Sequence, residues 1–245
     1  MKQAMIAVSF GTTHADAERD CIVPVEEALR AAFPDWTVAR AWTSRRIAQK
    51  LNARGAHIEN EIEALARLQS EGYEKLALIP THIIRGNEYE MVERAAGGVP
   101  VSAPLIDTEA DIEWMSDLLD GIAQREGRVL LAMGHGTEHP ANAIYRRLAE
   151  RLTDRARLAC VEGDYTLDET LNALMQQGER KVTLMPLMLV AGDHAKVDMA
   201  GDQQDSWKSR LTAKGFDVAL RLQGLGALEA VQSRFVEKAR AALQL

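Results

Sequence analysis

The chain has 245 residues, of which 47% are hydrophobic and 27% charged, and its formal net charge is −7. This is ordinary globular composition, sufficient for one large domain or two small ones. The acidic balance argues against nucleic acid or an anionic membrane as partner, and the uncharged apolar run 182–192 is shorter than the roughly 18 residues of a membrane span. Cys21 and Cys160 form neither a CxxC motif nor a disulfide framework. We therefore expect a cytoplasmic protein.

Short apolar runs alternate with longer amphipathic stretches along the chain. The runs predict strands and the amphipathic stretches predict helices. Strands are expected at 4–10, 37–43, 74–82, 99–104, 128–134, 158–162, 182–190 and 217–222. Helices are expected at 25–33, 57–71, 88–96, 108–124, 140–155, 167–177, 203–213 and 228–243. This alternation favours an α/β fold with mainly parallel sheets.

The two halves of the chain resemble each other. Residues 65–86 align with 171–192 at a shift of 106, with identities that include Gly72/Gly178 and Pro80/Pro186. In addition, "SFGTTH" (9–14) resembles "GHGTEH" (134–139) at a shift of 125. We expect two similar α/β lobes, 1–125 and 126–245, that face each other across a cleft. Each lobe would be a mainly parallel sheet flanked by helices.

Three side chains suited to metal binding follow expected strands of the second half. His135 follows 128–134, Glu162 ends 158–162, and His194 comes soon after 182–190. Because ligands bind outside the carboxyl ends of strands in α/β sheets, these side chains are expected at one edge. Two imidazoles and a carboxylate suit Co²⁺, Fe²⁺, Ni²⁺ or Zn²⁺. The structural alternatives are capping or pairing histidines and a capping or ion-pairing Glu162.

The other charged and glycine-rich segments are less specific. The internal repeat sets Glu88 opposite His194 and Phe10 opposite His135. No GxxxxGK[ST] motif occurs, so neither ATP nor another nucleotide is expected as cofactor. In "TSRRIAQK" (43–50), Arg45 and Arg46 could bind carboxylates at a helix start or form a solvated helix face. Three acidic residues that follow His194 could attract cations or only cap helices: Asp198, Asp202 and Asp205.

Several longer motifs resemble one known family. The stretches "SFGTT", "PTHIIRGNEYE", "MGHGTEHPANAIY", "VEG" and "LMPLMLVAGDHAKVDMAGDQQDSWKSRL" are similar to those of the CbiK-type anaerobic cobalt chelatases, over nearly the whole chain. The resemblance implies a ferrochelatase-like fold of two α/β lobes around a cleft. It also implies a lyase of cobalamin and porphyrin biosynthesis that inserts Co²⁺ into the tetrapyrrole sirohydrochlorin without ATP.

The resemblance also implies roles for individual residues. The metal-binding residues of the family fall on His135, Glu162 and His194, its proton acceptor on His135, and an acidic residue of the N-terminal lobe on Glu88. For the macrocycle we expect contacts from Phe10, Gly11, Thr12 and Arg85, with Arg45, Arg46 and Lys196 as further cations for its carboxylates. We expect a homo-oligomer.

Two alternatives to a cobalt chelatase stay open. One is an iron or nickel chelatase acting on the same macrocycle, because two imidazoles and a carboxylate discriminate poorly among these ions. The other is a non-catalytic carrier of tetrapyrrole or metal, which would need a cleft but no proton acceptor at His135.

Overall fold

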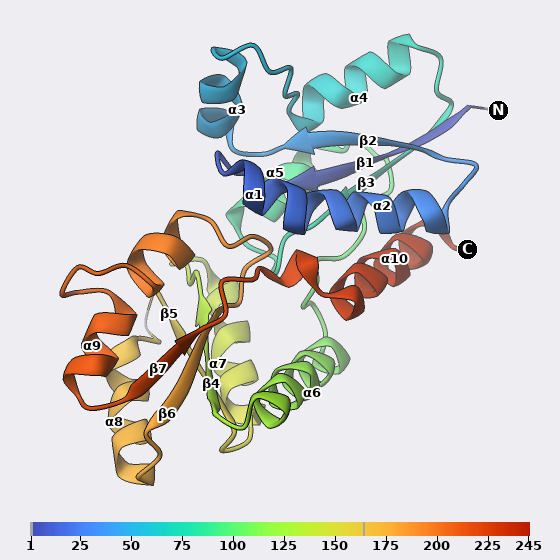
Figure 1. Ribbon diagram of the computed structural model, residues 1–245. Coiled ribbons are helices and arrows are strands. Elements are labelled where there is room, and N and C mark those ends of the chain that lie inside the picture. Colours follow the sequence, from blue (N-terminus) through green and yellow to red (C-terminus); the bar gives the residue numbers. More distant parts are fainter. Residues whose placement is uncertain (1, 164) are drawn as a thin grey trace. The chain divides into compact units, whose positions relative to one another are not determined.

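The computed structural model describes residues 2–163 and 165–245, which form two compact units. The first unit comprises Met1–Asp107 and Gly226–Leu245, and the second comprises Thr108–Leu225. The boundary expected at 125/126 instead falls inside helix α6 (Glu109–Glu126), which belongs to the second unit. The last helix, α10 (Glu229–Leu243), belongs to the first unit and packs against α2 (Val23–Ala32) (Figure 1).

The first unit contains a parallel sheet in the order β2-β1-β3. Its strands are β1 (Gln3–Ser9), β2 (Thr37–Trp42) and β3 (Lys75–Pro80). Ile6 and Val8 of the central strand pack in one core cluster with Leu68 of α4. The remaining helices are α1 (Ala15–Ala17), η1 (Glu18–Ile22), α3 (Arg45–Asn52), α4 (Glu61–Ser70) and α5 (Asn87–Ala95), and the short η4 (Leu225–Ala227) spans the boundary with the second unit.

The second unit contains a parallel sheet in the order β5-β4-β6-β7. Its strands are β4 (Val129–Gly134), β5 (Ala156–Cys160), β6 (Lys181–Pro186) and β7 (Asp217–Leu220). Leu131 and Met133 of the central strand pack with Leu171 of α8 in a core that also includes Trp207 of α9. Besides α6, the helices are η2 (Pro140–Asn142), α7 (Ala143–Arg151), α8 (Leu167–Gln177), η3 (His194–Met199) and α9 (Trp207–Ala213).

The internal repeat corresponds to repeated secondary structure. Helices α4 and α8 begin at Glu61 and Leu167, and strands β3 and β6 span Lys75–Pro80 and Lys181–Pro186, each pair 106 residues apart. The strand orders β2-β1-β3 and β5-β4-β6 also correspond. The expected α/β class with two mainly parallel sheets is therefore confirmed.

One expected strand does not form. Of residues 99–104, only Val101 pairs with the sheet, through an isolated bridge to Leu78 of β3. Pro100 and Pro104 have no N–H and cannot donate to a ladder, so the apolar run here does not extend into a strand. The expected strand 182–190 also ends early, at Pro186, although the apolar residues continue. No helix among the described residues is both long and apolar enough to cross a membrane.

Candidate metal site

His135 and Glu162 lie on two neighbouring loops at the carboxyl edge of the second sheet. His135 follows β4 directly, and Glu162 lies two residues beyond β5. The parallel pairing continues past the strand ends, because the Glu162 N–H donates to the His135 carbonyl at 2.8 Å. Backbone hydrogen bonds therefore hold together the two loops that carry these candidate ligands.

Gly136 permits the close approach of these two loops. Its φ of +78° lies in the left-handed region, and a Cβ placed on it would lie 1.9 Å from the Glu162 carbonyl oxygen. No side chain fits at that separation, so glycine is required here both for its backbone conformation and for the contact. The sequence "GHG" therefore has a structural reason for its second glycine.

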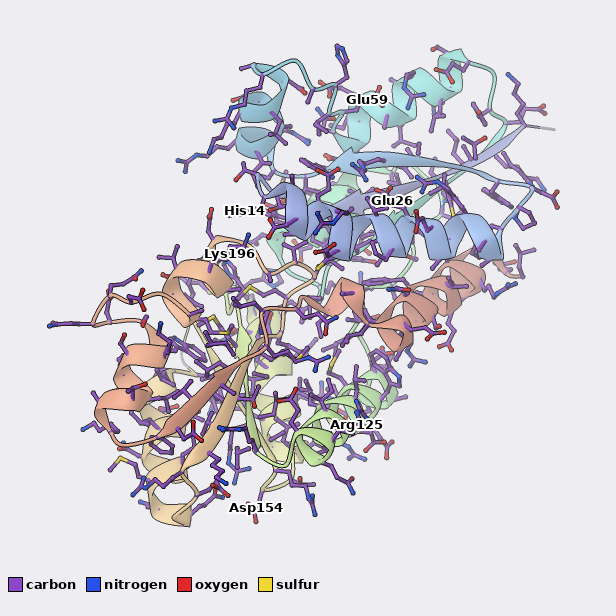
Figure 2. All side chains as sticks on the ribbon, in the orientation of Figure 1. His14, Glu26, Glu59, Arg125, Asp154 and Lys196 are labelled. Carbon is purple, nitrogen blue, oxygen red and sulfur yellow. The ribbon has the colours of Figure 1, made fainter. Side chains whose placement is uncertain are left out.

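His194 is positioned by a short π-helical segment, η3 (His194–Met199). Ala195 and Met199 are fully buried and join the core of the second unit, which fixes one side of the turn. His194 and Asp198 remain partly exposed, with 37% and 43% of their side-chain surface accessible. Lys196, labelled in Figure 2, belongs to the same turn. Single π turns are rare in proteins, and those that occur are often found at functional sites.

The structure brings the two predicted histidines into contact. Their ring centroids are 4.8 Å apart, and the rings meet edge to face at 88°. Nδ1 of His135 lies 2.8 Å from the carbonyl oxygen of Gly136, and Nδ1 of His194 lies 2.6 Å from Oδ2 of Asp198. Because a carbonyl and a carboxylate can only accept, each Nδ1 is the donor. In the neutral rings, Nε2 then carries the lone pair that can bind a metal ion or accept a proton.

The Glu162 carboxylate lies near Nδ1 of His135. Its Oε2 lies 3.9 Å from Nδ1 of His135, and 56% of its side chain is exposed. Among the residues that the structure describes, no group of three His, Cys, Asp or Glu side chains has the arrangement of a formed metal site. A site made from these three residues therefore requires the exposed Glu162 side chain to rotate.

The remaining predicted residues of the first half lie on the first unit. Phe10 follows β1 and is 49% exposed, a large apolar ring in solvent. Gly11, with φ +94°, lies against the Trp42 ring, where a Cβ would approach to 2.6 Å. Thr12 is buried and its hydroxyl accepts the His14 N–H at 3.2 Å. Phe10 is therefore the exposed member of this loop.

Glu88 lies in the first turn of α5, just beyond the carboxyl edge of the first sheet. Its Oε2 is buried and makes no hydrogen bond. A buried carboxylate oxygen without a partner costs free energy, so its retention marks Glu88 as a candidate functional group.

Two of the cations predicted to bind carboxylates are already paired. Arg85 donates to Asp107 at 3.1 Å and also to Glu93, and these hydrogen bonds raise its pKa. Arg45 donates to the buried Glu61 at 2.9 Å. Both guanidinium charges are thus compensated by the protein itself, which weakens the expectation that they bind substrate carboxylates.

Two structural features, one in each unit, were not predicted from the sequence. The hydrogen bond from His194 to Asp198 is one, although its i,i+4 spacing is visible in "HAKVD". The other is His82, which follows β3 and has both ring nitrogens buried without hydrogen-bond partners. Burial lowers the pKa of His82 to about 4, so this ring is neutral near pH 7. Only the packing of the fold reveals that environment.

Comparison with known proteins gives consistent matches over the whole chain. The family model described as "Cobalt chelatase (CbiK)" matches residues 3–244. The chain is 37% identical over 258 aligned positions to the sirohydrochlorin cobaltochelatase of Salmonella typhimurium, covering 100% of this chain and 98% of that protein. It is 32% identical to the sirohydrochlorin cobaltochelatase CbiKC of Nitratidesulfovibrio vulgaris, covering 93% of this chain and 86% of that protein.

Proposed function

Because the chain belongs to the CbiK cobalt chelatase family, we propose that it inserts Co²⁺ into sirohydrochlorin, and that it does so without ATP. The observation that carries this proposal is the contact between His135 and His194, each with Nδ1 engaged as a donor, in a chain that matches these enzymes over its full length. Co²⁺ is the substrate ion and the tetrapyrrole is the second substrate.

The proposed ligands of the ion are Nε2 of His135, Nε2 of His194 and the carboxylate of Glu162. Imidazole and carboxylate groups bind divalent cobalt. None of the three proposed ligands is a thiolate, the ligand typical of permanent structural sites. Such a site can hold the ion and then release it to four pyrrole nitrogens. The exposed Glu162 side chain joins the histidines by rotation when the ion arrives.

Insertion exchanges one Co²⁺ for two protons. Two of the four pyrrole nitrogens carry hydrogen, and both N–H bonds must break as the metal bonds form. A neutral imidazole is an effective acceptor near pH 7. We assign the first proton to Nε2 of His135, and we assign to Glu88 a role in proton removal from its position on the first unit.

The macrocycle is proposed to bind through shape and local polarity more than through the cations predicted from sequence. The exposed ring of Phe10 offers an apolar surface for a planar pyrrole. Gly11 and Thr12 fix the loop that presents this ring. Arg85 is the weakest member of the predicted binding set, since it is already paired with Asp107 and Glu93.

Two further properties are proposed with the activity. We propose a homo-oligomer, as the family resemblance implies. We also propose a cytoplasmic location, which is supported by a sequence that has two cysteines and no CxxC motif or disulfide framework.

A metalation assay tests the activity directly. Purified protein is mixed anaerobically with sirohydrochlorin and with Co²⁺, Fe²⁺ or Ni²⁺ in separate reactions, and the change in macrocycle absorption is followed. We expect acceleration with Co²⁺ over a protein-free control and over the His135→Ala, His194→Ala double variant. Acceleration with Fe²⁺ or Ni²⁺ alone would reassign the metal, and no acceleration with any ion would leave a binding protein.

A further inference from the structure

We propose that Asp198 is a positioning residue that makes His194 the stronger of the two imidazole ligands, so that Co²⁺ leaves His135 first and His194 last. This inference rests on the proposed function, because it concerns the same ion. It adds an order of ligand release and a residue that does not itself touch the ion.

The geometry of η3 (His194–Met199) supports a fixed Asp198–His194 pair. Nδ1 of His194 and Oδ2 of Asp198 are 2.6 Å apart, a short separation for a nitrogen donor and a charged acceptor. A π turn closes by i→i+5 hydrogen bonds, so residues four apart lie almost above one another. Backbone hydrogen bonds span Asp198, because the Ala200 N–H donates to the Ala195 carbonyl at 3.2 Å and the Gly201 N–H donates to the Val197 carbonyl at 3.0 Å. Backbone geometry therefore holds the carboxylate against the ring.

His135 has a different partner. Its Nδ1 donates to the carbonyl of the adjacent Gly136 at 2.8 Å, and a peptide carbonyl carries no net charge. Hydrogen bonds to a carboxylate are roughly twice as strong as those between neutral groups. A ligating histidine whose other nitrogen donates to a carboxylate becomes a more basic, better oriented ligand. The two imidazoles are therefore unequal donors, although they belong to one pair of contacting rings.

Unequal donors give the exchange of ligands a direction. The weaker bond, between Co²⁺ and Nε2 of His135, breaks as the first bond between Co²⁺ and a pyrrole nitrogen forms. The lone pair freed on His135 Nε2 then accepts the proton that this pyrrole nitrogen loses. His194 retains the ion until the remaining pyrrole nitrogens bind. One ring thus changes from ligand to base while the other ring holds the metal.

A double-mutant cycle on Co²⁺ binding, without macrocycle, tests the role of Asp198. The variants are Asp198→Asn and Asp198→Ala, each in the parent, His194→Ala and His135→Ala backgrounds. Asp205→Asn is the matched control, an exposed aspartate of the following loop. We expect Asp198→Ala to weaken Co²⁺ binding by about 10–100-fold in the parent and in His135→Ala, but by less than about 2-fold in His194→Ala.

The visible absorption of bound Co²⁺ gives a second readout that general loss of packing would not mimic. We expect Asp198→Asn to shift the cobalt bands while the circular dichroism of the protein stays unchanged, because only the donor strength of His194 changes. Equal weakening by Asp198→Ala in all three backgrounds, or unchanged affinity in the parent, would overturn the proposal. Co²⁺ binding with the expected coupling but no metalation would retain Asp198 as the residue that positions His194, and would refute both the order of release and the chelatase function.

Discussion

Ser44 and Glu162 hold corresponding places in the two sheets. The N–H of Ser44 donates to the Phe10 carbonyl at 3.2 Å, and the N–H of Glu162 donates to the His135 carbonyl at 2.8 Å. In both units, the acceptor is the residue that directly follows the central strand. The same backbone frame thus presents a serine and a phenyl ring in one unit, and a carboxylate and an imidazole in the other.

Glu88→Gln should slow metalation while leaving Co²⁺ binding without macrocycle nearly unchanged. The substitution keeps the size of the side chain but removes the charge of a carboxylate whose Oε2 is buried without a partner. Loss of a general base typically costs about 10²–10⁴-fold in rate. Steady-state kinetics and Co²⁺ titration of the same preparation measure both effects.

Glu90→Gln is the control for this variant, since Glu90 lies on the same helix and forms an ion pair with Arg94. We expect it to retain the parent rate. If Glu88→Gln weakened Co²⁺ binding as much as it slowed turnover, Glu88 would have to be a metal ligand.

His135→Ala and His194→Ala should respond differently to added Co²⁺. Loss of a pure ligand lowers affinity, which excess ion restores, whereas loss of a proton acceptor removes a contribution to the transition state that excess ion does not replace. We therefore expect saturating Co²⁺ to recover much more of the His194→Ala rate than of the His135→Ala rate. Rates measured across a metal titration decide the matter, with circular dichroism as the check on folding. Equal recovery would leave His135 as a ligand only.

Gly136→Ala should destabilise the second unit and displace Glu162. The left-handed conformation alone costs an alanine roughly 1–2 kcal/mol, and here the new Cβ would also overlap the Glu162 carbonyl oxygen. Gly178→Ala is the matched control, because Gly178 has a similar φ of +76° but no atom within 4 Å of its Cβ position. Denaturant unfolding should show a clearly larger loss for Gly136→Ala. Equal losses of unfolding free energy in the two variants would mean that the loops of Gly136 and Glu162 can move apart without destabilising the protein.

Stability should fall in mild acid because of His82. Burial lowers its pKa to about 4 from an ordinary value of 6.5, so between these values the unfolded chain binds a proton that the folded protein excludes. His82 therefore does not lower the free energy of unfolding above about pH 6.5. As the pH falls from there toward 4, the free energy of unfolding decreases by up to about 3 kcal/mol because of this group. His82→Phe should flatten this part of the stability curve relative to the parent.

His57→Phe serves as the control for the acid effect, since His57 is exposed. Urea unfolding at a series of pH values from 7.5 to about 4.5 would compare the slopes. A His82→Phe curve parallel to that of the parent would contradict the assignment of the slope to His82.

The fold was largely accessible from the sequence because its signals are local. The repeat at a shift of 106 correctly matched β3 (Lys75–Pro80) to β6 (Lys181–Pro186) as equivalent strands. Apolar runs predicted each of the seven strands among the described residues. The run at 99–104 misled because prolines interrupt the hydrogen-bonding pattern without breaking the hydrophobic one. The place of α10 (Glu229–Leu243) could not be read from its periodicity, which shows that a helix has an apolar face but not which unit covers it.

The proximity of the two candidate histidines could be predicted from the sequence, but the geometry of their rings could not. Strand-end position predicted that His135 and His194 would lie together, and the structure confirms that contact. No pattern in the sequence revealed which nitrogen of each ring is engaged, because this depends on a loop carbonyl for one ring and on a π turn for the other. The pairing of Arg85 was hidden for a similar reason, since its partner Asp107 lies 22 residues away.

The return of α10 (Glu229–Leu243) to the first unit has a consequence for synthesis on the ribosome. The second unit is one continuous segment, Thr108–Leu225, whereas the first unit needs both ends of the chain. Domains generally fold as units, and N-terminal ones usually fold first during translation. Here the first unit can be completed only after the last helix emerges, when the segment with both histidines is already complete. Nascent chains arrested shortly after residue 225 has emerged would thus carry a folded second unit, with both histidines, and an incomplete first unit.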